Sequence, residues 1–314
     1  MEFFRKQTNI DFLGRVKIAY VVSALLIITS IVSLSTRGLN MGLDFTGGTL
    51  VEVEYESTPS LDGVRSALAA GGFGDAVVQT FGTTRDLVIR VPVRSEGESS
   101  ADISTQVLEA LEAGGDAGGL EMRRVEFVGP QMGDELRDQG GLAMIYVLIG
   151  ILIYVAFRFQ WRFAVGAVVA LVHDVLITFG ILSVLQIEFD LTVVAAVLAV
   201  LGYSLNDTIV VFDRIRENFR TLRKGDAKEV INTSVNQTLS RTIMTSFTTL
   251  LVLIVLFFLG GSIIHAFAYT LIIGVGIGTY SSIFVASPVI MALGVSKQDL
   301  MPVAKEGEAL DELP

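Results

Sequence analysis

Cysteine is absent from this sequence of 314 residues, and histidine occurs only twice, as His173 and His265. The absence of cysteine excludes disulfide bonds, thiol nucleophiles and zinc or iron–sulfur sites with cysteine ligands. Two histidines are too few for a metal site built from several imidazole groups. We therefore expect neither a bound metal nor a cofactor.

Positive charge is also scarce, because 23 Lys and Arg residues face 33 Asp and Glu residues and the formal net charge is −10. This balance argues against nucleic acid as a partner. The charge is unevenly placed, since residues 37–138 contain 8 basic and 18 acidic residues and the remainder contains equal numbers of each sign. The chain therefore contains one acidic module, residues 37–138, and the rest of the sequence has no net charge.

Hydrophobic residues make up 51% of the chain, and the mean hydropathy is +0.61. Soluble domains rarely reach such values, so the composition indicates a membrane protein. Stretches of about 20 apolar residues can cross a hydrocarbon core about 30 Å thick as helices. The first stretch is longer than the hydrophobic region of a signal peptide, so we expect it to be retained. The predicted spans are 16–35, 140–157, 163–185, 191–212, 241–259 and 264–292.

Lys and Arg gather in the N-terminal flank and in two of the loops, whereas the loops near 188–190 and 260–262 have none. Because cytoplasmic loops are rich in these residues, both termini are predicted to be cytoplasmic. The predicted parts are a cytoplasmic N-terminus (1–15), transmembrane helix 1 (16–35), an extracytoplasmic domain (36–139), a five-helix transmembrane bundle (140–292) with a cytoplasmic amphipathic loop (213–240), and a cytoplasmic tail (293–314).

The extracytoplasmic module has the pattern of strand, helix, strand, strand, helix and strand. Its first strand, TLVEVEYE (49–56), alternates apolar and polar residues as a half-buried strand does. AVVQTF and DLVIRV flank a GTTR turn and indicate a hairpin. The βαββαβ order predicts a ferredoxin-like α+β domain between the first and second membrane helices. The predicted fold class is a polytopic α-helical membrane protein with six transmembrane helices and this outer domain.

Ionisable side chains within the predicted spans are few, and lipid offers them no solvation. Asp207 follows Asn206 in the fourth span, and a carboxylate there costs about 2.5 kcal/mol or more on insertion. Arg241 begins the fifth span from the same side of the membrane, so we expect it to form an ion pair with Asp207 that protonation would release. His173 and Asp174 in the third span fit a functional role and a structural pairing equally well.

Five segments carry a resemblance to a known family. The chain closely resembles the SecF family of bacterial and archaeal protein-translocase subunits in MGLDFTGGT (41–49), VEFVGPQMGDELRDQG (125–140), HDVLITFGILS (173–183), LGYSLNDTIVVFDRIRENFR (201–220) and TLSRTIMTS (238–246). The resemblance implies membership of the resistance–nodulation–division superfamily. Members of that superfamily use the proton gradient through carboxylates in the fourth span of each half of a twelve-span unit.

By this resemblance, the six-span chain is a half-unit that SecD completes in a bacterial or archaeal plasma membrane. The pair is expected to bind the SecYEG channel and to use the proton motive force for late steps in the translocation of unfolded preprotein, without being an enzyme. Asp207 and Arg241 occupy the proton-pathway positions, with Asn206, Asp174 and His173 as supporting polar residues.

Small residues recur every four positions in the last span, at Gly274, Gly278 and Ser282. Such a stripe lets helix backbones approach closely, so it predicts a helix-packing face. We expect this face to contribute to the contact with SecD.

Three other functions remain open from the sequence. The chain could be half of a proton-driven exporter of small molecules or lipids from the same superfamily, although such exporters are normally single twelve-span chains. Asp174 and Asp207 could form the dyad of an intramembrane aspartic protease, which requires two carboxyl groups that share a proton. A purely structural membrane scaffold is the third alternative, and it would leave Asp207 and Arg241 unexplained.

Overall fold

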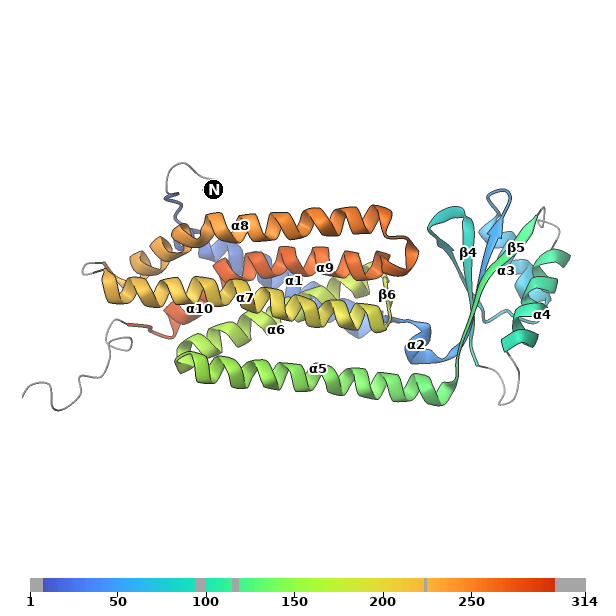
Figure 1. Cartoon of the computed structure of the whole chain (residues 1–314), viewed down its shortest axis with the longest axis horizontal. Coiled ribbons are helices and arrows are strands. Elements are labelled where there is room, and N and C mark those ends of the chain that lie inside the picture. The colour runs from blue at the N-terminus through green and yellow to red at the C-terminus, as the bar shows by residue number, and fades with distance from the viewer. Residues whose placement is uncertain (1–7, 94–99, 115–118, 223–224, 297–314) are drawn as a thin grey trace, which may run out of the picture.

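The computed structural model describes residues 8–93, 100–114, 119–222 and 225–296, and it confirms the six predicted membrane helices. The helices form an elongated bundle, and an α/β domain extends from one end of it (Figure 1). Parts of the predicted cytoplasmic termini, 1–7 and 297–314, lie outside the described residues. The spanning helices are α1 (Val16–Thr36), α5 (Pro130–Arg158), α6 (Trp161–Leu185), α7 (Leu191–Thr221), α8 (Ala227–Leu259) and α9 (Ser262–Ser281), the last continuing through the π-helical segment η2 (Ser282–Ala286) into α10 (Ser287–Ala292).

The outer domain has the predicted βαββαβ order. Its four antiparallel strands lie in the order β3-β4-β2-β5, which is the ferredoxin-like arrangement. Two helices cover the face of the sheet that is turned away from the bundle, and Val51, Val53 and Leu68 lie in the core between sheet and helices (Figure 1). The elements are β2 (Gly48–Tyr55), α3 (Leu61–Ala70), β3 (Val77–Phe81), β4 (Thr83–Val91), α4 (Ser100–Ala113) and β5 (Leu120–Val128).

Two connections of the chain join this domain to the bundle. On one side β5 leads almost directly into α5, and on the other the short helix α2 (Leu43–Thr46) leads through two glycines into β2. Gly47 and Gly48 have φ values of 67° and 128°, which other residues rarely adopt. A Cβ on Gly48 would also lie 2.5 Å from the carbonyl oxygen of Val91. The turn from α2 into the sheet therefore requires both glycines.

Further contacts fasten the domain to the outer end of the bundle. β1 (Asn40–Met41) pairs in parallel with β6 (Glu188–Phe189), which lies between α6 and α7. The Asp44 carboxylate accepts a hydrogen bond from the backbone N–H of Leu191, at 3.0 Å. Arg90 of β4 forms an ion pair with Glu188, and it opposes the rise in the pKa of Glu188 that burial causes. The sheet is thus held to the bundle by an ion pair as well as by its two connections.

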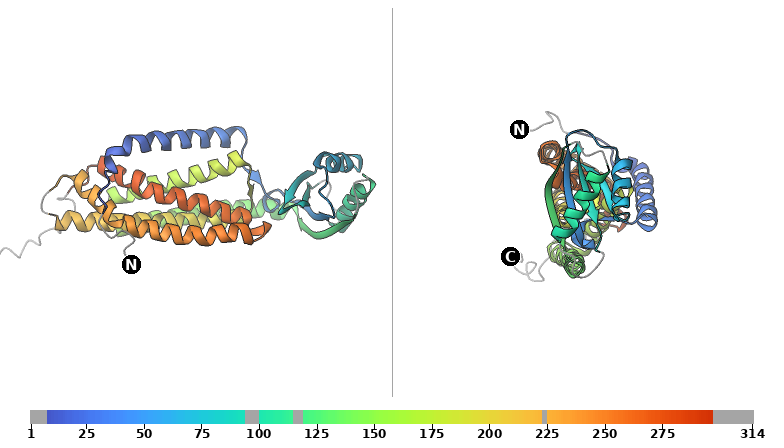
Figure 2. Two further views of the ribbon diagram at one scale, coloured as in Figure 1. Left: turned by 90° about the horizontal axis from the view of Figure 1, so that it is seen from above. Right: turned by 90° about the vertical axis from the view of Figure 1, so that its right-hand side faces the viewer.

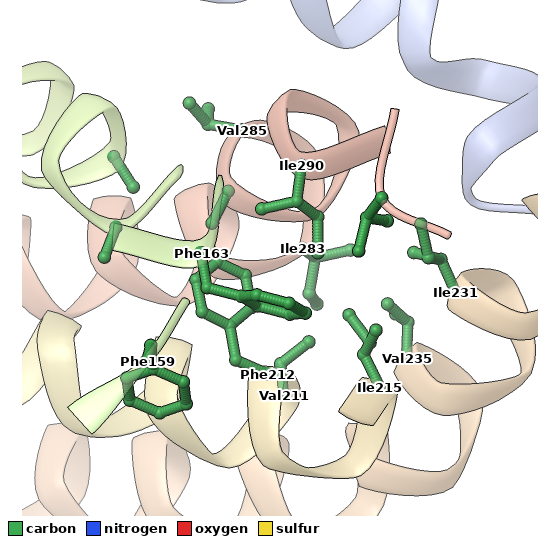
Figure 3. Packing of buried hydrophobic residues seen from close by; sticks show 14 of the residues in the cluster. Phe159, Phe163, Val211, Phe212, Ile215, Ile231, Val235, Ile283, Val285 and Ile290 are labelled. Carbon is green, nitrogen blue, oxygen red and sulfur yellow. The ribbon is translucent and has the colours of Figure 1, made fainter. Parts of the chain in front are cut away.

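The segment 213–240 was predicted as a cytoplasmic amphipathic loop, but most of its described residues belong to two membrane helices, since α7 extends to Thr221 and α8 begins at Ala227. With 31 residues at 1.5 Å each, α7 is about 46 Å long and exceeds a hydrocarbon core of about 30 Å. The apolar side chains of this segment pack α7 and α8 against each other and against α6. This core includes Phe163, Phe212, Ile215, Ile231 and Val235 (Figure 3).

Candidate functional site

Asp207 lies at the meeting point of three helical segments. Its carboxylate is buried and accepts a hydrogen bond on each oxygen. The Thr242 hydroxyl of α8 donates to Oδ1 at 2.7 Å, and the Ser282 hydroxyl of η2 donates to Oδ2 at 2.5 Å. Hydroxyl donors therefore compensate for part of the desolvation of this carboxylate.

Arg241 does not form the expected ion pair with Asp207 among the residues that the structure describes. Its neighbour in sequence, Thr242, takes the position facing the carboxylate. Successive residues of an α-helix point about 100° apart, so Arg241 lies on an exposed face of α8. Its influence on Asp207 is a longer-range Coulombic attraction.

Asn206 is also exposed, one residue away from the buried Asp207 on α7. It lies on the same strip of α7 as Gly202, one helical turn earlier, which is exposed as well. Asn206 and Asp207, although adjacent in sequence, thus lie on different sides of α7. Asp207 faces the interior of this bundle and Asn206 faces outward.

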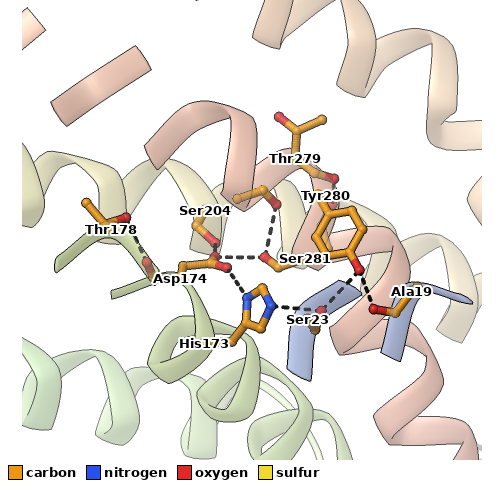
Figure 4. A network of polar contacts seen from close by, with 11 residues as sticks. Ala19, Ser23, His173, Asp174, Thr178, Ser204, Thr279, Tyr280 and Ser281 are labelled. Atoms are coloured by element: carbon orange, nitrogen blue, oxygen red, sulfur yellow. Dashed lines mark hydrogen bonds and ion pairs between the residues drawn. The ribbon is translucent and has the colours of Figure 1, made fainter. Parts of the chain in front are cut away.

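A second buried carboxylate, Asp174 on α6, forms a larger polar network (Figure 4). His173 Nδ1 lies 2.9 Å from its Oδ1. The hydroxyls of Ser204 and Ser281 donate to its Oδ2 at 2.5 and 2.7 Å. Asp174 has no exposed surface, and His173 is 5% exposed. The network joins α6 to α7 and α9, and His173 extends it to α1 through Ser23.

The two carboxylates are connected through consecutive residues. Ser281, the last residue of α9, donates to Asp174, and Ser282, the first residue of η2, donates to Asp207. The roles of both serines and of Thr242 could not be predicted from the sequence, because serine and threonine are common in membrane helices and carry no signal of their partner. The four-residue spacing that placed Ser282 on a packing face was the available signal.

Gly274 and Gly278 pack inside the chain, which corrects the expectation that they contact SecD. A Cβ on Gly274 would lie 2.1 Å from Val200 Cγ2, and one on Gly278 would lie 2.9 Å from Ser204 Cβ. Both glycines therefore allow α9 to approach α7 closely. The same close approach brings Ser204 and Ser281 together on Asp174.

A protease dyad finds no support in this geometry. Two catalytic carboxyl groups must share a proton directly. Among the described residues, Asp174 and Asp207 form no hydrogen bond with each other, and each is held by its own hydroxyl donors. The described residues also include no group of three or more acidic or histidine side chains arranged to hold a metal ion.

Comparison with known families identifies the family of this chain. Residues 107–296 match the family described as protein export membrane protein SecD/SecF, C-terminal, and residues 32–59 match the SecD/SecF GG motif. The chain is 53% identical to the protein translocase subunit SecF of Vibrio alginolyticus, covering 100% of this chain and 99% of that one. The chain belongs to the SecF branch of the SecD/SecF family. It is also 49% identical to the SecF of Pseudomonas aeruginosa, with 98% of each chain covered.

A solved structure supports the SecF fold. The crystal structure of SecDF, a translocon-associated membrane protein from Thermus thermophilus, matches with a TM-score of 0.82 and 38% identity. The match covers 93% of this chain and 39% of the SecDF chain. The GG motif of the family contains Gly47 and Gly48, the two residues that the turn into the outer domain requires.

Proposed function

We propose that this SecF chain works with SecD to use the proton motive force for preprotein translocation through SecYEG. The observation that carries the proposal is Asp207, a buried carboxylate in a membrane helix whose bonded partners are hydroxyl groups from two other segments. A group of this kind can change its charge without breaking an ion pair. Asp207 is the proton-binding residue in this proposal.

Ser282 provides the step from proton uptake to movement. Its hydroxyl also lies 3.0 Å from the backbone carbonyl oxygen of Thr279, which offers a second acceptor. A protonated Asp207 gains an O–H group on one oxygen, and a hydroxyl beside that oxygen can accept this hydrogen only if its own hydrogen points to another acceptor. Giving its hydrogen to Thr279 instead of Asp207 would change the bonding of the first residue of η2, where α9 changes its helical type. Such π-helical segments frequently occur at functional sites.

Arg241 and Asn206 have a different role in the proposal. Both are exposed on neighbouring helices that would otherwise face lipid, where an arginine is costly. We assign this face of α7 and α8 to the contact with SecD, which would bring its own carboxylate toward Arg241. The buried pair of His173 and Asp174 supports the site by holding α6 against α7 and α9.

The proposed orientation places both termini in the cytoplasm and the outer domain on the other side of the plasma membrane. The basic residues of the N-terminal flank and of the α5–α6 and α7–α8 connections support it. Because the chain has no cysteine, a single cysteine at exposed Thr84 can report its side. It should react with an impermeant thiol reagent from outside the intact plasma membrane. Reaction only after permeabilisation would show that the orientation is reversed.

The function is tested with Asp207→Asn, which keeps the size of the side chain and cannot titrate. Export into membrane vesicles is measured with and without a proton gradient. We expect the variant to lose the stimulation by the gradient and to keep ATP-driven export and co-purification with SecD. Arg241→Met should behave in the same way.

Asp213→Asn is the matched control, because it removes a partly exposed carboxylate near the end of the same helix. It should respond to the gradient as the parent does. If Asp207→Asn also gains from the gradient like the parent, Asp207 only joins helices and the proposed mechanism is wrong.

A further inference from the structure

The buried pair of His173 and Asp174 begins a chain of four polar contacts that runs across three helices. His173 Nδ1 lies 2.9 Å from Asp174 Oδ1, and its Nε2 lies 3.1 Å from Ser23 Oγ on α1. Ser23 Oγ lies 3.0 Å from the Tyr280 hydroxyl on α9. That hydroxyl donates to the backbone carbonyl oxygen of Ala19, at 2.8 Å (Figure 4). The pair is thus connected to the contact between α1 and α9.

The number of hydrogens available to these four contacts depends on the protonation of His173 and Asp174. Four contacts need four hydrogens. With a neutral imidazole and an ionised Asp174, only three are present, one each on His173, Ser23 and Tyr280. The carbonyl oxygen of Ala19 can only accept, so Tyr280 gives its hydrogen there and Ser23 must choose between His173 and Tyr280. One contact is then left without a hydrogen.

One additional proton on the pair supplies a hydrogen for each of the four contacts. Nε2 then carries a hydrogen and donates to Ser23, and Ser23 donates to Tyr280. This holds whether the other shared proton lies on Nδ1 of His173 or on Oδ1 of Asp174. The pair is also neutral overall in this state, which suits an almost fully buried position in a membrane helix.

The surroundings of the pair contain few other titratable groups. The side chains bonded to it are hydroxyls: Ser23 of α1, Ser204 of α7 and Ser281 of α9. Tyr280 is the titratable group beyond Ser23, and Asp207 is held by the residue that follows Ser281. The described contacts thus give the pair no counter-charge other than its own members.

We propose that His173 and Asp174 form a second proton-accepting site, and that its proton completes the contact between α1 and α9. When the proton leaves, Ser23 gives its hydrogen to His173 and its bond to Tyr280 is lost. Helix α1 lies at the edge of the bundle beside α6, so this bond is one of the polar contacts that hold it (Figure 2). The inference goes beyond the proposed function, because it holds whether or not Asp207 drives export.

Nuclear magnetic resonance of labelled histidine tests this proposal directly. The chain has two histidines, so His265→Gln, at an exposed position, leaves His173 as a single nitrogen-15 imidazole signal. The full chain is studied in lipid nanodiscs, with and without co-expressed SecD. We expect Nε2 to carry a hydrogen at pH 5 and to lose it as the pH rises.

Two matched variants separate this proposal from a structural role. Tyr280→Phe leaves two contacts and two hydrogens, so the additional proton gains no hydrogen bond. The loss of the Nε2 hydrogen should then occur about one pH unit lower, a roughly tenfold weaker proton affinity. Tyr203→Phe removes another hydroxyl, which is bonded to Ser246, and should leave the titration unchanged. An Nε2 without hydrogen at pH 5, or equal midpoints for the two variants, would overturn the proposal.

Discussion

Single hydroxyl groups, at the scale of the residue, make two buried carboxylates tolerable in this membrane bundle. Asp207 and Asp174 each accept two hydroxyl hydrogen bonds, and Asp174 has His173 in addition. A permanent ion pair would have held Asp207 in one charge state, because an opposite charge nearby favours the ionised form. Hydroxyl groups can donate to or accept from the carboxyl group, so both charge states can be bonded.

Asp174→Ala should lower the free energy of unfolding by about 3 kcal/mol or more, because Ser204, Ser281 and His173 would lose their shared acceptor. Asp174→Asn keeps one acceptor oxygen and should cost less. Thermal unfolding of the purified chain in detergent measures both effects. Asp213→Ala removes a carboxylate that is 44% exposed and should cost about 1 kcal/mol or less. An equal loss for the two alanine variants would contradict the structural importance of Asp174.

At the scale of the element, the sequence predicted where helices and strands occur, but not which elements pack against each other. The six spans and the order of strands and helices in the outer domain follow from hydropathy and alternation, and both are confirmed. The extent of α7 and α8 could not be predicted, because an amphipathic helix looks the same beside lipid headgroups and beside another helix. Arg241 was predicted to begin the fifth span, but it lies near the middle of α8, and on which side of the helix it lies depends on which neighbour α8 packs against.

The contact between α7 and α9 requires a glycine at position 274 but not at position 276. Gly274→Leu should destabilise the bundle by about 1–3 kcal/mol, because even a Cβ there would overlap Val200. Gly276→Leu is the matched control, since its Cβ would meet nothing within 4 Å. Unfolding of both variants in detergent gives the comparison. If they unfold alike, the close approach of the two helices is not needed for stability.

At the scale of the whole molecule, the chain corresponds to one part of a longer SecDF chain. This chain aligns with 39% of the Thermus thermophilus SecDF chain, so that structure contains a further part. Gly202 and Asn206 form an exposed strip on α7, and Arg241 on α8 adds a charge to a surface that is otherwise largely uncharged. Gly274 and Gly278 of α9 already pack against α7, so a partner must contact another face of the bundle.

Gly202→Leu tests this surface without disturbing the chain itself. A Cβ on Gly202 would meet nothing within 4 Å, so the variant should fold and insert normally. A leucine there would obstruct a closely packed helix of SecD, and small residues are typical of such contacts. We expect co-purification with SecD to fall severalfold, while Gly276→Leu, also at an exposed glycine, retains it. Undiminished co-purification of Gly202→Leu would place the SecD contact on another face of the bundle.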